Sequence, residues 1–329
     1  MALPAWLIFF ERTFPSANMV LVKGKKPNEK PILVDTGFGS DFAATEQLLK
    51  GAGVAPEQLS LVVNTHYHSD HVGGNHGFQT QYGIPIATYY SEARLVNQRD
   101  FSACSAVWLA QPIEAYSVDR SLREGDEIDA GGVVLEVIHT PGHTLGHMSL
   151  YGRQDEVLIL GDAVHADDVS WVNIFREGAD ALQRTMETID KLLKLRVKVA
   201  VSGHGGVHQN PQEAMERALS RYEKWLKAPE KTAWHAVKRI FSYALMLRDG
   251  IDEGDMGKFL MGCPWFHDYA RAYMGVETPH DFVEPLLNEM VRSGATEWRN
   301  GRLMPCTAYN APSREWYPQR LMPREWGEG

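Results

Sequence analysis

The stretch LVVNTHYHSDH, residues 61–71, decides how the rest of the sequence is interpreted. Its first three residues are apolar and indicate a short buried strand over residues 61–63. Three histidines and an aspartate follow directly: His66, His68, Asp70 and His71. Histidine seldom gathers this densely for packing alone, and imidazole nitrogens and carboxylate oxygens are ligands of Zn²⁺, Fe²⁺ and Mn²⁺. The stretch therefore predicts a metal site at the end of a strand.

Three later apolar runs also lead into residues of a metal-binding type. The residues that follow these runs are His143, Asp162 and His204. In layered α/β proteins, ligands collect at the carboxyl ends of strands, where loops converge. Apolar residues at helical spacing over 41–49 and 179–193 indicate helices between the strands. We therefore expect an α/β domain whose sheets are covered by helices.

The seven candidate ligands are too many for one tetrahedral zinc, which takes three or four. They suit two ions, one held by three imidazoles and one by two imidazoles and a carboxylate, with a second carboxylate as a bridge. The candidates for the first ion are His66, His68 and His143. Those for the second ion are Asp70, His71 and His204, and the candidate bridge is Asp162. Two ions about 3.5–4 Å apart can clamp a bridging water and make hydroxide available at neutral pH.

Length and composition narrow the class of protein. The chain has 329 residues, enough for one large domain or two ordinary ones, and its net charge of −9 argues against broad binding to nucleic acid or anionic membranes. The three cysteines lack C-x-x-C spacing, which suits a reduced, cytoplasmic protein. No apolar run is long enough to span a membrane, and we expect Trp6–Phe10 to form a first strand and not a signal peptide.

The pattern changes after Pro211. Helical spacing over 212–227 and 232–247, with no further strand that leads into a ligand, predicts a second, mostly helical region. Residues 282–305 predict a helix followed by a small hairpin about Asn300-Gly301. We therefore expect two domains, 1–210 with the metal site and a mostly helical 211–329.

The ordered motifs resemble one known family. ILVDTG at 32–37, HYHSDH at 66–71 and the later PGHTLGH, GD and SGHGG resemble the metallo-β-lactamase-fold hydrolase superfamily over Met19 to about Val207. The resemblance implies an αββα sandwich with a dinuclear site at one edge, and it assigns the same seven ligands. It implies two divalent ions, with zinc favoured and iron or manganese as alternatives. The C-terminal region resembles, more weakly, the winged-helix extension of some members.

Details of the motifs narrow the branch that the chain resembles. Members that hydrolyse β-lactams lack the bridging aspartate, whereas Asp162 is present here, as in the glyoxalase II, lactonase and nuclease branches. Diiron members usually carry Glu at the position of His68. The basic C-terminal pattern with which glyoxalase II binds glutathione is not found. Similar lactonases often have Tyr where this chain has His165, which argues against a simple transfer of their mechanism.

We expect a dinuclear hydrolase that cleaves an ester-like carbonyl bond, in a carboxylic ester, lactone or thioester, with a metal-bridging hydroxide. Asp70 would orient the hydroxide, and His165 would donate a proton or polarise the carbonyl unless it is an exposed loop histidine. The alternative is a phosphodiesterase or RNA nuclease of the same fold. Minor alternatives are β-lactam hydrolysis, a persulfide dioxygenase and a non-catalytic regulator. A small-molecule substrate is expected, and a homodimer is left open.

Other residues are expected to support the site. Asp35 would be a structural hydrogen-bond acceptor beneath it, and His147 would orient a ligand. The glycines of residues 202–206 would let the backbone pass close to the metal. Three aromatic residues belong to segments expected to overhang the metals, where they would form a pocket wall or core packing: Trp108, Trp171 and Phe175.

Overall fold

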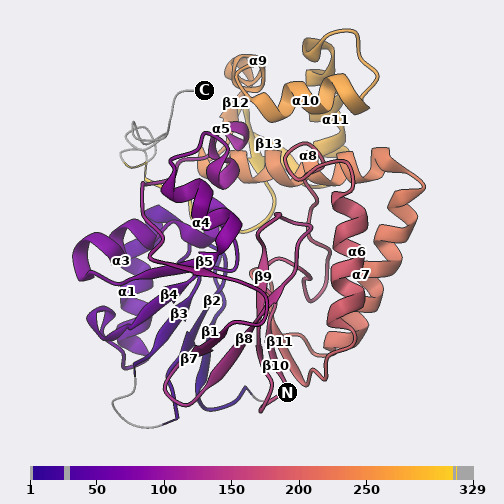
Figure 1. Cartoon of the computed structure of the whole chain (residues 1–329). Coiled ribbons are helices and arrows are strands. Elements are labelled where there is room, and N and C mark those ends of the chain that lie inside the picture. Colours follow the sequence, from indigo (N-terminus) through magenta and orange to yellow (C-terminus); the bar gives the residue numbers. More distant parts are fainter. Residues whose placement is uncertain (1–2, 26–29, 314–315, 317–329) are drawn as a thin grey trace.

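The computed structural model of the chain describes residues 3–25, 30–313 and 316. Two β-sheets pack face to face, and helices cover both outer faces (Figure 1). Further helices of the C-terminal region lie across one end of this sandwich. The predicted αββα arrangement, followed by a mostly helical C-terminal region, is therefore confirmed.

The first sheet has six strands in sequence order. They are β1 (Leu7–Phe10), β2 (Met19–Val22), β3 (Ile32–Val34), β4 (Leu61–Val63), β5 (Ile86–Tyr89) and β6 (Arg120–Leu122). Strands β1 to β3 pair antiparallel, whereas β3 to β6 pair parallel. Because parallel strands end at the same edge, Asp35 after β3 and the histidine-rich stretch after β4 emerge side by side.

The second sheet has five strands in the order β11-β10-β9-β8-β7. They are β7 (Glu127–Asp129), β8 (Val134–His139), β9 (Met148–Gly152), β10 (Val157–Ile159) and β11 (Val199–Val201). Strands β7 to β10 pair antiparallel, and β10 pairs parallel with β11. The chain therefore leaves β10 toward Asp162 and β11 toward His204 at one edge.

Three apolar layers hold the sandwich together. Alternate residues of both sheets form the layer between them, including Val63 and Leu135. Helices α1 (Phe42–Gly51), α3 (Asn75–Tyr82) and α4 (Tyr90–Asn97) contribute to the layer outside the first sheet. Helices α6 (Ala181–Leu192) and α7 (Pro211–Leu226) cover the second sheet. Two short helices, α2 (Ser69–Val72) and α5 (Ala106–Leu109), lie in the connecting loops.

The C-terminal region is built around α8 (Pro229–Leu247). The remaining elements are α9 (Glu253–Met261), α10 (Pro264–Tyr273), α11 (Val283–Arg292) and strands β12 (Ile251–Asp252), β13 (Thr296–Arg299) and β14 (Arg302–Pro305). The predicted helix and hairpin are present as α11, β13 and β14, and the turn residues Asn300 and Gly301 both have positive φ, 51° and 76°. The domain boundary at 210/211 stays a prediction, since α7 packs against α6 in one apolar layer.

Several short elements escaped the sequence analysis. Strand β9 is buried at every position and therefore shows no alternation, and β7 has only three residues. Residues 90–121, where the sequence shows no clear periodicity, contain α4, α5 and the start of β6. Among the described residues, no helix is long and apolar enough to cross a membrane.

Two neighbouring residues of β8 test the layer between the sheets. Leu135 is fully buried, whereas Val134 is 46% exposed. We expect Leu135→Ala to lower the free energy of unfolding by about 2–5 kcal/mol, because it leaves a cavity between the sheets. The control Val134→Ala should change it by less than about 0.5 kcal/mol. Denaturant unfolding measures both, and equal losses would contradict this packing.

Candidate metal centre

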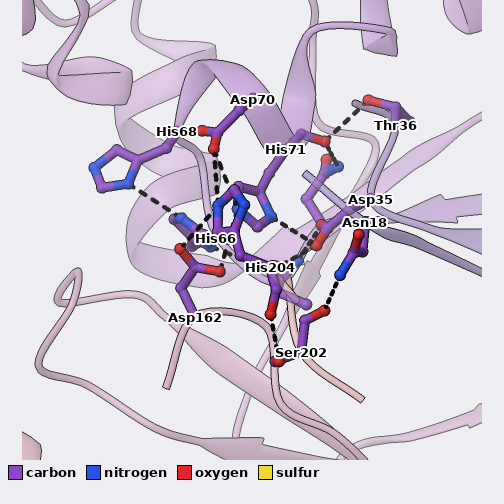
Figure 2. Close-up of polar contacts among 12 residues, drawn as sticks. Asn18, Asp35, Thr36, His66, His68, Asp70, His71, Asp162, Ser202 and His204 are labelled. Atoms are coloured by element: carbon purple, nitrogen blue, oxygen red, sulfur yellow. Dashed lines mark hydrogen bonds and ion pairs between the residues drawn. The ribbon is translucent and has the colours of Figure 1, made fainter. Parts of the chain in front are cut away.

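The loops at one edge of the sandwich bring all seven candidate ligands together, and Figure 2 shows most of them pointing toward one another. The first group consists of three imidazoles from two different sheets. His68 Nδ1 lies 3.1 Å from His66 Nε2 and 2.9 Å from His143 Nε2. Three ring nitrogens at these distances converge on a common point, as ligands of one cation do.

The second group lies beside the first and is joined to it by a carboxylate. Asp70 Oδ2 lies 3.2 Å from His204 Nε2 and 3.8 Å from His71 Nε2. Asp162 faces both groups, because its Oδ1 is 3.4 Å from His71 Nε2 and its Oδ2 is 3.7 Å from His143 Nε2. The arrangement therefore has the order that the sequence predicts, with Asp162 in the middle.

The protonation states favoured by the surroundings suit metal ligands at His66, His68 and Asp162. Burial lowers the pKa of His66 and His68 well below its ordinary value, and neighbouring imidazoles lower it further, so both rings keep free lone pairs. Burial alone would raise the pKa of Asp162, but the charges of His204 and His71 outweigh it and hold that pKa well below the usual range. Neutral imidazoles and an ionised carboxylate are the forms that bind metal. At His71 and His204 burial would lower the pKa, but the neighbouring carboxylates outweigh it and raise that pKa, so these two rings would release a proton on binding an ion.

Two buried donor atoms of the cluster also lack hydrogen-bond partners within the described protein, as expected of atoms that bind a cation. His71 Nε2 and Asp162 Oδ1 are buried and have no hydrogen-bond partner among the described residues. Buried polar atoms nearly always have a partner, and a buried charge is expected to be paired or to coordinate a metal. A set of imidazole nitrogens and carboxylate oxygens suits Zn²⁺, Fe²⁺ or Mn²⁺.

Hydrogen bonds from outside the cluster orient its imidazoles. Asp35 accepts a hydrogen bond from the Thr65 backbone N–H at 2.8 Å, and its Oδ2 lies 2.8 Å from His71 Nδ1 (Figure 2). His71 therefore presents Nε2 to the cluster. Asp35 itself has φ of 59°, in the left-handed region, as it turns out of β3. The expected role of Asp35 as a structural acceptor beneath the site is confirmed.

The loop after β10 holds the ring of His143. His143 Nδ1 donates to the carbonyl oxygen of Trp171 at 2.9 Å, and Ser170 Oγ lies at the same distance from that nitrogen. The indole of Trp171 stacks on His68, with ring centroids 5.6 Å apart and an interplanar angle of 14°. One loop therefore fixes two imidazoles of the first group.

Two further residues fix the loops that carry Asp162 and His204. His147 Nε2 accepts a hydrogen bond from the Asp162 backbone N–H at 2.9 Å, so His147 positions a candidate ligand as expected. Asn18 donates to the carbonyl oxygens of Ser202 at 2.9 Å and Gly205 at 2.7 Å. Sequence reasoning missed Asn18, because a lone asparagine in a turn gives no signal of a contact with a residue far along the chain.

Two buried carboxyl groups that the sequence analysis missed hold the loop around His143. Glu92 accepts a hydrogen bond from Thr144 Oγ1, and Glu177 accepts one from the Leu145 backbone N–H at 2.6 Å. Burial raises the pKa of Glu92 well above its ordinary value and that of Glu177 to about 7. A signal existed for Glu92 alone, since helical spacing places it on the buried face of α4.

A cavity of about 570 Å³ lies over the cluster, and His165 and Trp171 line it. The ring of His165 lies 5.6 Å from that of His204, and its Nδ1 is buried without a hydrogen-bond partner among the described residues. Burial lowers the pKa of His165 to about 3, so the ring is neutral at neutral pH. His165 therefore faces the site and is not an exposed loop histidine.

Trp108 and Phe175 do not line this cavity. Trp108 donates its indole N–H to Asp268 at 2.7 Å, and the ring of Phe175 lies 4.8 Å from that of Tyr269. Both side chains pack against Tyr269 of α10, in the apolar cluster of the C-terminal region. For Trp108 and Phe175 the expectation of a pocket wall is therefore wrong and the alternative, core packing, is correct. Of the three aromatic residues, only Trp171 lines the cavity.

A two-sheet sandwich with imidazoles and carboxylates gathered at one edge defines a class of metal-binding α/β proteins. The sequence model of the metallo-beta-lactamase superfamily matches residues 12–204, more than half of the chain, and this range includes all seven candidate ligands. The chain belongs to the metallo-beta-lactamase superfamily, whose members typically bind divalent metal ions. The resemblance inferred from the motifs is confirmed.

The chain is similar to curated members of this superfamily. It is 28% identical to the acyl-coenzyme A thioesterase MBLAC2 of Gallus gallus over 254 residues, which cover 70% of this chain and 87% of that protein. It is 27% identical to the hydroxyacylglutathione hydrolase of Hyphomonas neptunium, over 51% of this chain and 59% of the relative. Among solved structures, the metallo-beta-lactamase family protein TTHA1429 from Thermus thermophilus shares the fold, with a TM-score of 0.62, 20% identity, and coverage of 92% of this chain and 100% of that one.

Two glycines in the loop after β11 provide a test of the cluster. A Cβ added at Gly203 would lie 2.1 Å from Asp162 Oδ1 and 2.6 Å from the ring of His71, whereas at Gly206 the nearest atom of another residue would be 3.8 Å away. We expect Gly203→Ala to weaken metal binding at least tenfold by displacing Asp162, and Gly206→Ala to leave it unchanged. Calorimetric titration with Zn²⁺ measures both. Equal affinities for the two variants would contradict the geometry.

Proposed function

We propose that the chain is a metal-dependent hydrolase of thioesters, one of the three ester-like classes that the sequence predicts. The observation that carries the proposal is the cluster of seven imidazoles and carboxylates, five of which line a cavity of about 570 Å³. The prediction of an enzyme for ester-like bonds is confirmed by the relatives, named as a thioesterase and as a hydrolase of an acylated thiol. The net charge of −9 argues against the nuclease alternative.

Two divalent ions, with zinc favoured over iron or manganese, would be held by the seven side chains. The first ion would be held by His66, His68 and His143. The second would be held by Asp70, His71 and His204, and Asp162 would bridge the two. Bound ions of this kind supply a nucleophilic water at neutral pH and a Lewis acid for the carbonyl oxygen. Three free cysteines suit a reducing compartment, so we also propose the cytoplasm.

The side chains around the cavity would position the reactants. Asp70, which reaches the cavity and has a pKa held below its ordinary value by His71 and His204 despite burial, would orient the attacking water and accept its proton. The neutral ring of His165 would donate a hydrogen bond to the carbonyl oxygen or to the leaving sulfur. Trp171 would pack against the acyl group and exclude water.

A panel of substrates tests the proposal: a p-nitrophenyl ester and a thioester with the same acyl group, a lactone and a phosphodiester. We expect the thioester to be cleaved with the highest kcat/KM, because thioesters are the substrates named for the relatives. Exhaustive chelation should abolish turnover, and Zn²⁺, Fe²⁺ or Mn²⁺ should restore it. Full activity after chelation, or preference for the phosphodiester, would overturn the proposal.

A single substitution tests the role of Asp70. We expect Asp70→Asn to lower kcat for the thioester by about 10²–10⁴-fold, the usual contribution of a positioned acid or base. The circular dichroism spectrum should be unchanged. Asp190→Asn, an exposed position on α6, serves as the control and should keep wild-type turnover. Near wild-type turnover of Asp70→Asn would contradict the assignment.

A further inference from the structure

The cavity over the candidate ligands is closed on its far side by helix α8. One face of this helix lines the cavity, through residues three or four positions apart. These residues are His235, Lys238, Arg239, Ser242, Tyr243 and Met246. Because such spacing places side chains on the same face of a helix, α8 forms one continuous wall of the cavity.

The two halves of this wall differ in chemistry. The second half lies next to the metal centre, since the ring of Tyr243 is 6.3 Å from that of Phe14, which stacks on His204 at 4.9 Å. Arg239 lies one turn earlier, about 6 Å back along the helix axis. The cationic half of the wall therefore begins one helical turn from the half beside the metal centre.

Two arginines in this part of the cavity share one carboxylate. Arg221 Nη1, on α7, lies 2.8 Å from Asp168 Oδ1, and Arg239 forms an ion pair with Asp168 Oδ2. Both guanidinium side chains are more than 40% exposed and line the cavity, so a ligand can reach them. A guanidinium group matches a carboxylate or phosphate in charge and geometry. Two guanidinium groups and one carboxylate leave one positive charge that is not neutralised.

The other charges around the cavity do not cancel this pair. Lys238 pairs with Glu289 at 3.1 Å, a carboxylate that Arg292 also contacts, and its side chain is 30% exposed. Asp167 also lines the cavity but forms no ion pair with Arg221 or Arg239 in the described part of the chain. Arg221 and Arg239 are more exposed than Lys238, at 44% and 48%, so their guanidinium groups are the cations of the cavity wall that an incoming anion reaches most easily.

A histidine beside the arginines has hydrogen-bonding capacity that the protein does not use. Both ring nitrogens of His235 are buried and have no hydrogen-bond partner among the described residues. Burial and the charges of Arg221 and Lys238 lower the pKa of His235 to about 4, so the ring is neutral at neutral pH and has one donor and one acceptor. His235 lines the same cavity, so a rotation of its ring that exposes either nitrogen would add a hydrogen bond to a bound polar group.

We propose that Arg239 and Arg221 form an anion subsite that binds a carboxylate or phosphate on the thiol portion of the substrate. Asp168 occupies the guanidinium pair in the free protein and acts as an internal competitor. The inference rests on the proposed thioester hydrolysis and restricts it to thioesters that carry an anionic group outside the scissile bond. It assigns α7 and α8 a role in substrate selection.

Matched thioesters with and without the anionic group test the subsite. One pair is the butyryl thioesters of 4′-phosphopantetheine and pantetheine, and the other is those of glutathione and its diethyl ester. We expect Arg239→Ala to raise KM about tenfold or more for a charged member, because a charge-assisted hydrogen bond is lost, with less than a threefold change for its neutral partner. The pair with the larger response identifies phosphate or carboxylate as the recognised group.

Asp168→Asn separates recognition from a structural role, because it removes the competitor and keeps the shape of the side chain. We expect it to lower KM for the charged substrate severalfold, opposite to Arg239→Ala. If the ion pair only held the loop to α8, both variants would impair charged and neutral substrates alike. Arg196→Ala, at an exposed ion pair with Glu156 outside the cavity, is the matched control and should change neither pair.

The failures of the two proposals are distinguishable. If wild-type protein cleaves none of the four thioesters, the proposed function is wrong. If it cleaves them but charged and neutral members respond equally to Arg239→Ala, the subsite is wrong and the function stands. Calorimetric binding of 4′-phosphopantetheine and of glutathione gives a readout independent of turnover. Affinities that do not differ between wild type and Arg239→Ala would also overturn the subsite.

Discussion

Five imidazoles and two carboxylates lie in adjoining groups, with ligand atoms within 4.8 Å of one another in each group. Five of these side chains are buried, whereas Asp70 and His204 are half-buried. Burying an ionised carboxylate such as Asp162 costs free energy unless it is paired or coordinates a metal. The neighbouring rings of His66 and His68 are kept neutral, so their lone pairs face inward. A divalent cation satisfies both kinds of group, and Asp35 and the Trp171 carbonyl set the ring orientations that such a cation needs.

The C-terminal helices belong to the same arrangement. Tyr222 of α7 donates its hydroxyl to the Ser170 carbonyl oxygen at 2.7 Å, within the loop that holds His143. Tyr243 of α8 donates to the Pro15 carbonyl oxygen at 2.9 Å, next to Phe14 on His204. The helices that close the cavity therefore also brace candidate ligands of both groups. Tyr243 therefore both lines the cavity and holds the segment next to His204.

Much of the fold and the core of the site could be predicted from the sequence. Short apolar runs that lead into histidine or aspartate identified β4, β10 and β11, because a buried strand and its ligand are neighbours in the chain. The supporting contacts could not be predicted in the same way. Asn18 and Glu177 act on loops distant in sequence, and Trp108 and Phe175 turn toward α10, whose position follows from the packing of the whole C-terminal region.

The central claim is that residues from both sheets hold two cations between them. Anomalous X-ray diffraction from crystals of the zinc-loaded protein, recorded on either side of the zinc absorption edge, tests it most directly. The account predicts two peaks about 3.5–4 Å apart, one among His66, His68 and His143 and one beside His204, with Asp162 between them. A single peak, or peaks elsewhere in the molecule, would contradict it.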